Sequence, residues 1–180
     1  MGGVVIAAKI AALLGLPIEV FPCREITDPA DRNRSIGSVS FDEVVVQTNC
    51  HDIPQDYISH QIALLRTGLR HEWQNYYSNN LPTSLRYKPV IIVGDILKSC
   101  NSIIACLKSI MKQMPLKIIV AVPIVSAEAA RKIGEIVDEV VFVQMKNEFN
   151  LGNASYVEYP AVELSEVNAL LMDSKKEIEL

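Results

Sequence analysis

The sequence predicts an α/β fold with a doubly wound, mainly parallel sheet flanked by helices. Apolar runs at 90–93, 117–123 and 139–144 have the length of strands that are buried on both faces. Two stretches between these runs, 103–114 and 127–136, carry apolar residues at helical spacing. Strands that alternate with helices in this way are typical of a parallel sheet.

The remaining elements follow from periodicity and from residues that begin or end helices. Gly15 is expected to end the first helix, and Ser126 is expected to cap the helix that follows it. The predicted order is a helix at 4–16, a strand at 17–23, a polar loop at 24–37, a strand or hairpin at 38–47, a helix at 56–77, the three strands and two helices above, and a helix at 162–171.

Length and composition indicate one ordinary globular domain. The chain has 180 residues, of which 49% are hydrophobic, and a net charge of −4. We expect a single domain over 1–172 followed by a charged tail at 173–180. No apolar run reaches the ~20 residues that cross a bilayer, which predicts no membrane association. The basic residues are scattered, and this argues against nucleic-acid binding.

The four cysteines show no metal-binding or disulfide pattern. They are separated by at least five residues, so no CxxC pair occurs. No signal peptide is recognisable in the first 16 residues, which contain a single basic residue, Lys9. A reduced, cytoplasmic chain is the simplest interpretation.

The segment from Val90 to Ile103 is the strongest functional signal. It is predicted to be a buried strand, a short polar turn and a helix start in direct succession. Ligands of parallel sheets bind at the carboxyl ends of strands, where helix N-termini favour anions. Ser99 and Ser102 would add hydroxyl donors to such a site.

This segment resembles the phosphoribosyl pyrophosphate motif of the type I phosphoribosyltransferases. In that motif four apolar residues precede two acidic residues and a small-residue loop closed by Thr or Ser. The resemblance covers nearly all 180 residues and points to the uncharacterised, predicted branch of the family. Outside the motif it rests on Gly2-Gly3-Val4, Ala7-Ala8, Arg24, Ile36-Gly37, Val120-Ala-Val-Pro123, Val137-Asp-Glu-Val-Val141 and Phe149 to Tyr156.

The chain departs from the family pattern at several positions. Gly94-Asp95 stands where the family has two acidic residues, so one carboxylate remains. Ile96 and Cys100 stand where the phosphate loop has glycines, and Ile96 would be strained at a positive φ. Lys98 is an addition that could supply a positive charge. Cys100 is interpreted either as a thiol with a lowered pKa or, more simply, as a small residue.

The beginning of the chain also differs from the family. The resemblance implies a strand before Gly2-Gly3, in a sheet of order 2-1-3-4-5, between strands at 18–21 and 90–93. Only Met1 precedes the glycines. Three explanations stay open: the coding region starts upstream, another piece or chain fills the slot, or the two strands close up. The open edges allow a homo-oligomer.

The resemblance implies transfer of ribose 5-phosphate from phosphoribosyl pyrophosphate to a nitrogenous acceptor, with release of pyrophosphate. Mg²⁺ would be bound mainly through the substrate, with no metal site of the protein's own, and the loop at 24–37 would act as a lid. The implied site comprises Asp95 as the catalytic residue, Lys98, Ser99, Cys100, Asn101 and Ser102 at the 5-phosphate, Gly2, Gly3 and Arg24 at the pyrophosphate, and Phe149 and Tyr156 at the acceptor.

Two other classes of function remain open. One is a non-catalytic regulator that binds a phosphate, nucleotide or phosphoribosyl ligand. The other is an interaction domain with an empty crevice. Arg24 could equally be a solvated arginine, and Phe149 could be a buried residue beside a turn.

Overall fold

The computed structural model describes residues 2–48, 50–77 and 83–146. Their contacts divide them into two compact units, each made of separate pieces of the chain. Unit 1 comprises residues 2–20, 88–98 and 116–146, and unit 2 comprises residues 21–87 and 99–115, apart from the positions not described. None of the described helices combines the length and apolar character that crossing a bilayer requires.

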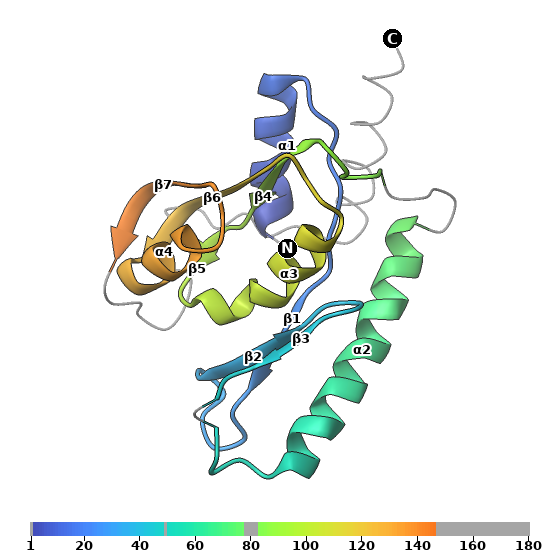
Figure 1. Cartoon of the computed structure of the whole chain (residues 1–180), viewed down its shortest axis with the longest axis vertical. Coiled ribbons are helices and arrows are strands. Elements are labelled where there is room, and N and C mark those ends of the chain that lie inside the picture. The colour runs from blue at the N-terminus through green and yellow to red at the C-terminus, as the bar shows by residue number, and fades with distance from the viewer. Residues whose placement is uncertain (1, 49, 78–82, 147–180) are drawn as a thin grey trace. The chain divides into compact units, whose positions relative to one another are not determined.

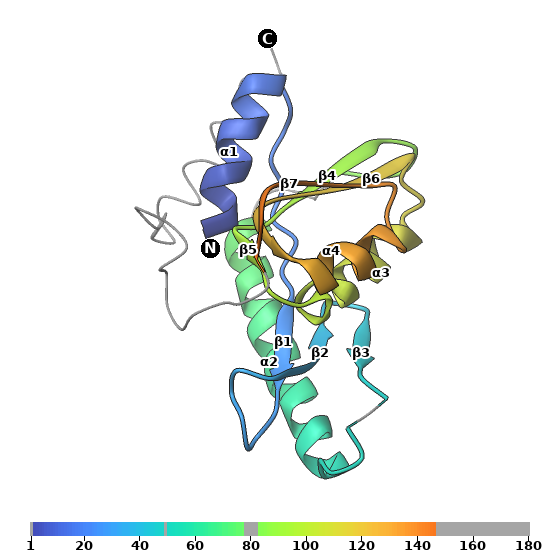
Figure 2. The same cartoon turned by 90° about the vertical axis from the view of Figure 1, so that its left-hand side faces the viewer.

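Unit 1 contains a parallel sheet (Figure 1). Its elements are α1 (Gly2–Leu14), β4 (Pro89–Val93), β5 (Ile96–Leu97), β6 (Lys117–Ser126), α4 (Ala127–Gly134) and β7 (Glu139–Lys146). Strand β6 pairs in parallel with β4, β5 and β7. Helix α4 runs beside β6 and β7 (Figure 2), and α1 contacts β4. The predicted α/β class, with a mainly parallel sheet flanked by helices, is confirmed.

Strands β4 and β5 follow each other along the same edge of β6 and act as one interrupted strand. Val93 pairs with Ala121 and Ile96 pairs with Ile124, so the register is unchanged across the gap. The two residues between them face Val122 and Pro123, and proline has no N–H to donate. The ladder is therefore interrupted at Pro123 and resumes beyond it, and β6 extends to Ser126, three residues past the predicted end.

The helix signals in unit 1 work as the sequence predicts. The Ser126 hydroxyl accepts a hydrogen bond from Ala129 N at 3.0 Å and caps α4. Gly15 follows the last residue of α1 with a φ of +64°. The strand predicted at 17–23 is wrong, however, because these residues form no strand. The next residues, Arg24 to Thr27, pair with a neighbouring strand instead.

Unit 2 contains an antiparallel sheet packed on a long helix. Its elements are β1 (Arg24–Thr27), β2 (Ser35–Val39), β3 (Val44–Val46), α2 (Gln55–Tyr77), a 3-10 turn η1 (Cys100–Ser102) and α3 (Ile104–Lys112). The strand order is β1-β2-β3. The predicted hairpin and the long helix are both confirmed.

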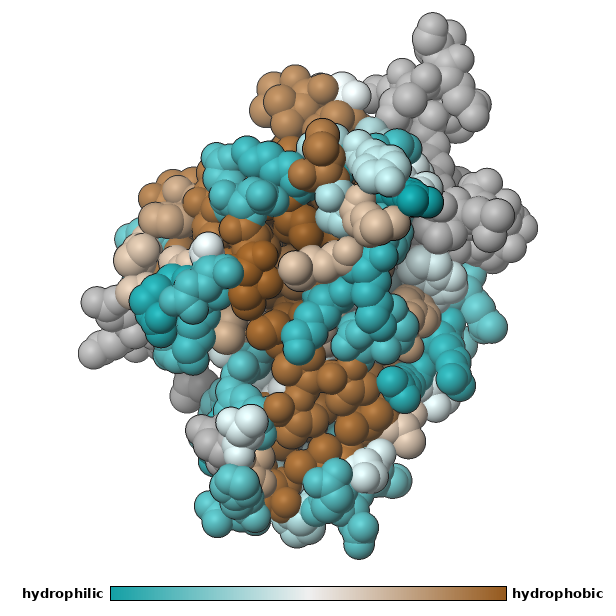
Figure 3. Space-filling model, viewed as in Figure 1, coloured by the Kyte–Doolittle hydropathy of each residue, from teal (hydrophilic) through white to brown (hydrophobic). Residues whose placement is uncertain are grey.

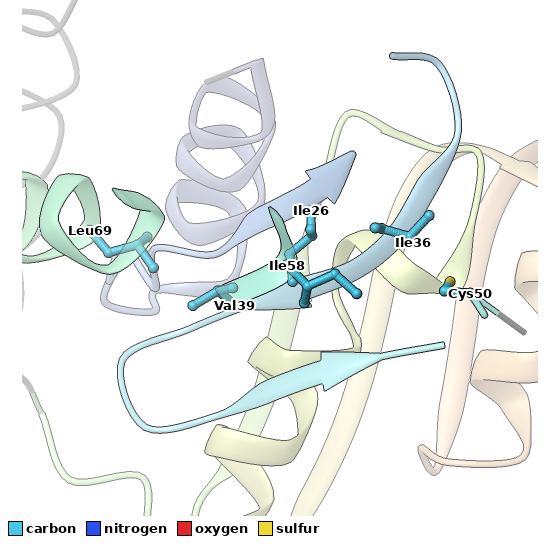
Figure 4. Packing of buried hydrophobic residues seen from close by; sticks show 6 residues of the cluster. All are labelled: Ile26, Ile36, Val39, Cys50, Ile58 and Leu69. Carbon is cyan, nitrogen blue, oxygen red and sulfur yellow. The ribbon is translucent and has the colours of Figure 1, made fainter. Parts of the chain in front are cut away.

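The core of unit 2 lies between the sheet and α2. Its buried members are Ile26, Ile36, Val39, Cys50, Ile58 and Leu69, shown together in Figure 4. Half-buried apolar residues, among them Val44 and Ile62, pack against this cluster. Figure 3 shows apolar surface between the hairpin and α2. The apolar stripe of α2 is thus core packing, as the sequence predicts.

The sequence predicts one continuous, lid-like loop at 24–37, and the prediction of a continuous loop is wrong. Both of its ends are strands, and residues 28–34 alone connect them. The connection is braced by the buried Asp28, whose carboxylate accepts hydrogen bonds from Ala30 N at 2.8 Å and Arg34 Nη1 at 3.0 Å. A buried carboxylate held by two donors ties the two strands together at this end.

A buried hydroxyl network ties α3 to the hairpin in unit 2. Ser109 Oγ donates to Asp42 Oδ1 and lies 2.5 Å from Ser40 Oγ. Lys112 Nζ lies 2.5 Å from Glu43 Oε1 and 3.4 Å from Asp42 Oδ2. Burial raises the pKa of Asp42. The hydrogen bond from Ser109 and the positive charge of Lys112 outweigh this effect, so the pKa lies below its usual value. The network therefore favours the charged carboxylate.

We expect Ser109→Ala to destabilise the protein by about 1–2 kcal/mol, because Ser40 and Asp42 lose a buried partner. Because the folded-state pKa of Asp42 is lowered, its contribution is present above about pH 4 and is lost as the pH falls further. Denaturant unfolding at pH 7 and pH 3 checks this: the difference between the variant and the wild type should be smaller at pH 3.

Ser59→Ala is the matched control, since Ser59 is exposed on α2. Its stability should equal or slightly exceed that of the wild type, because alanine is the better helix former. Equal unfolding free energies for Ser109→Ala and the wild type would show that the network does not stabilise the fold.

Candidate functional site

Asp95 lies within the strand line of unit 1 and not in a loop after it. It stands opposite Pro123, between the paired residues of β4 and β5. Its Oδ1 accepts a hydrogen bond from Ile96 N at 2.9 Å, and the residue is half-buried. The break in the ladder is thus occupied by a carboxylate that is fixed against its own backbone.

Ile96 is not strained in this arrangement. It pairs with Ile124 as the first residue of β5. Among the described residues other than glycine, only Tyr87 and Met114 have positive φ angles. The expected phosphate turn from Asp95 to Ser102 is therefore corrected to a second strand segment followed by a 3-10 turn.

The start of α1 packs directly on the end of β4. A Cβ atom on Gly3 would lie 3.1 Å from the carbonyl oxygen of Val93 and 3.2 Å from Gly94 Cα. Gly2, beside it, is buried. The first N–H groups of a helix lack acceptors within the helix and carry partial positive charge. Glycine thus brings the anion-favouring end of α1 against the strand that carries Asp95.

Gly94 is confined by a side chain. A Cβ atom there would lie 3.1 Å from Val122 Cγ1, and Val122 is buried on β6. An acidic side chain at position 94 would have to displace this valine. The packing across the sheet therefore favours glycine at this position.

The residues expected at the 5-phosphate mostly belong to unit 2 and hydrogen-bond within it. Ser99 Oγ caps η1 by accepting from Asn101 N at 3.2 Å. Asn101 Nδ2 donates to Ser35 O at 3.2 Å, and the buried Cys100 contacts Asn101 Oδ1. Ser102 contributes its backbone to η1. Lys98 belongs to unit 1 and is exposed.

Arg24 begins a strand, whereas the sequence places it at a strand end. Its guanidinium forms an ion pair with Glu72 of α2 and donates to Cys23 O at 3.2 Å. A cation already neutralised by a carboxylate attracts a second anion less strongly. Phe149 and Tyr156, expected at the acceptor, lie outside the described residues.

Two thiols of unit 2, those of Cys23 and Cys106, are poor nucleophiles. All four cysteines are free, and Cys50, Cys100 and Cys106 are buried. Burial raises the pKa of Cys23 to about 11 and also raises that of Cys106. The thiolate is the reactive form, so both groups are protonated at neutral pH. Covalent catalysis through these two cysteines is disfavoured.

Sequence reasoning missed two features of the site region. Pro123 interrupts the ladder opposite Asp95, and its position inside the apolar run 117–126 was the available signal. The Ser40–Ser109 contact carried no signal, because it joins residues far apart in the chain. In the part of the chain that the structure describes, no three His, Cys, Asp or Glu side chains form a metal-binding group.

Comparison with known proteins supports the fold. No family model matches the chain. The crystal structure of TT1426 from Thermus thermophilus is similar over 96% of this chain and 84% of that chain, with 26% identity and a TM-score of 0.77. The structure of the AQ2163 protein from Aquifex aeolicus matches 91% of this chain and 81% of that chain, with 15% identity and a TM-score of 0.38. The similarity to TT1426 assigns no activity.

We expect Gly3→Ala to be more damaging than Gly94→Ala. The Gly3 methyl would meet backbone atoms of β4, so α1 must shift, whereas the Gly94 methyl meets one side chain that can move by a few tenths of an ångström. Thermal unfolding should show a loss of about 1–3 kcal/mol for Gly3→Ala.

Gly68→Ala is the control, because nothing lies within 4 Å of its Cβ position on the exposed side of α2. That variant should be stabilised, since alanine favours a helix. If Gly3→Ala were as stable as the wild type, α1 would not pack on β4 as described.

Proposed function

We propose that the chain binds phosphoribosyl pyrophosphate and transfers its ribose 5-phosphate group to a nitrogenous acceptor, releasing pyrophosphate. The packing of α1 on the end of β4 is the observation that carries this proposal. It brings first-turn amides, which favour an anion, to the strand that holds Asp95. A diphosphate joined to a ribose needs both kinds of group, amides for phosphate oxygens and a carboxylate for sugar hydroxyls.

Each group has a stated role in the proposal. The amides at Gly2 and Gly3 bind the pyrophosphate, and Asp95 accepts hydrogen bonds from the ribose hydroxyls. Catalysis would rest on orientation and electrostatic stabilisation of a cation-like sugar centre, with no covalent nucleophile. The binding of the 5-phosphate by residues 99–102 is a prediction from the sequence alone.

Mg²⁺ enters the proposal together with the substrate. One carboxylate, Asp95, stands at the break in the strand line, and this is too few protein ligands for a dedicated metal site. Mg²⁺ commonly keeps several waters and binds through substrate phosphates. It would be held mainly by diphosphate oxygens, where it neutralises their charge.

A non-catalytic phosphate-binding regulator is the second candidate. It is favoured by Gly94, which leaves one carboxylate where the family has two, and by the pairing of Ile96 in β5. A segment fixed in a sheet offers fewer backbone amides to a phosphate than a glycine loop does. This candidate shares the binding step and lacks the transfer.

Calorimetric titration of the full chain with phosphoribosyl pyrophosphate and Mg²⁺ tests binding. We expect tighter binding of this compound than of ribose 5-phosphate or inorganic phosphate. Asp95→Asn should weaken binding of both sugar phosphates by about 10-fold or more, the value of a hydrogen bond to a charged group. Inorganic phosphate should bind the variant unchanged.

The control is Glu135→Gln, which removes an exposed carboxylate after α4. It should bind all three ligands as the wild type does. Pyrophosphate release in the presence of nucleobases then separates the transferase from the regulator. If none of the three compounds binds, both candidates are wrong.

A further inference from the structure

Strand β7 is an apolar edge of the unit 1 sheet. It pairs with β6 along one side, and the described residues provide no strand on its other side (Figure 1). Its apolar side chains are exposed: Val141 by 47%, Phe142 by 40%, Val143 by 88% and Met145 by 45%. An edge of this kind exposes backbone donors and acceptors together with apolar surface.

The features that usually protect an edge strand are missing from β7. Natural edges are kept short or carry proline, a bulge or a charge in the middle. Strand β7 has eight residues, keeps one register with β6 throughout, and contains no proline. Its charged residues, Glu139 and Lys146, stand at the two ends. Among the described residues, no strand or helix covers the outer edge of the six residues between them, which can therefore receive another strand.

The order of charges selects the orientation of that strand. At the start of β7, Lys117 forms an ion pair with Glu139, and the Asp138 carboxylate accepts a hydrogen bond from Ile118 N, so this end carries a net formal negative charge. Lys146 makes the other end basic. Two copies of β7 aligned in parallel would bring like charges together. Aligned antiparallel, the acidic end of each copy meets the basic end of the other, and opposite charges across a strand pair are stabilising.

We propose that β7 pairs with β7 of a second copy of this chain, antiparallel and around a two-fold axis. In an antiparallel ladder opposing residues share a face, so the axis must pass through one residue position. With the axis at Phe142, each Val141 faces Val143 of the other copy, and each Asp138 faces Lys146. The sheet then continues through both copies. This inference is independent of phosphoribosyl binding.

Sedimentation equilibrium of the full chain over a range of concentrations tests the proposal. The apparent mass should rise from the 20.0 kDa of one chain toward the mass of a dimer. Val143→Lys should weaken dimerisation by about 10-fold or more, because it places like charges near the axis. Leu13→Lys is the matched control, since Leu13 is also exposed, by 85%, but lies on α1. It should dimerise as the wild type does.

Cross-linking gives a second readout that does not depend on the lysine variant. At the axis, Phe142 of one copy faces Phe142 of the other, at a Cα separation that permits a disulfide. Phe142→Cys should therefore form a disulfide-linked dimer with oxidised glutathione far faster than Leu13→Cys does. A monomer at all concentrations overturns the proposal. The proposal is also overturned if the chain forms a dimer, Val143→Lys dimerises as the wild type does, and Phe142→Cys forms a disulfide-linked dimer no faster than Leu13→Cys.

Discussion

The parallel sheet of unit 1 depends on the hydrogen bonds of β6. This strand pairs with β4 and β5 along one edge and with β7 along the other. Its side chains from Ile118 to Ser126 are mostly buried, as expected of a strand covered on both faces. One residue of the run, Pro123, cannot donate to either ladder. The break between β4 and β5 lies opposite this proline, so the location of Asp95 follows from the covalent structure of one residue in a neighbouring strand.

Much of the fold could be predicted from the sequence, because its elements carry local signals. The runs at 90–93, 117–123 and 139–144 are strands, and Ser126 and Gly15 bound their helices as expected. The error at 17–23 has a different origin. Ile18 to Phe21 suits a strand by composition, but none of the described strands pairs with it. Arg24 to Thr27 is less apolar and is a strand because β2 supplies its hydrogen bonds. Strand pairing is non-local, and composition does not report it.

The candidate site could be predicted only in part, for a related reason. The sequence predicts Asp95 in a turn after an apolar strand, whereas it lies within the strand line, and it predicts Gly2 and Gly3 just before a helix that in fact begins at Gly2. It does not show that Gly3 touches the end of β4, since about 90 residues separate them. Nor does it show that Ile96 pairs with Ile124 and so avoids the strain expected in a loop. The ion pair between Arg24 and Glu72 likewise joins two elements that are adjacent only after folding.

The two outer strands of the sheet differ in a way that assigns them different roles. At β4, the start of α1 packs so closely on the strand end that a methyl group on Gly3 would meet Val93 O. Because the backbone of α1 already occupies this space, the end of β4 cannot pair with a further strand there. At β7, by contrast, Val143 is almost fully exposed and the charges are confined to the strand ends. The proposed ligand site is therefore placed beside β4, where helix amides meet a carboxylate. The proposed association between chains is placed at β7, where the described side chains form an exposed apolar surface.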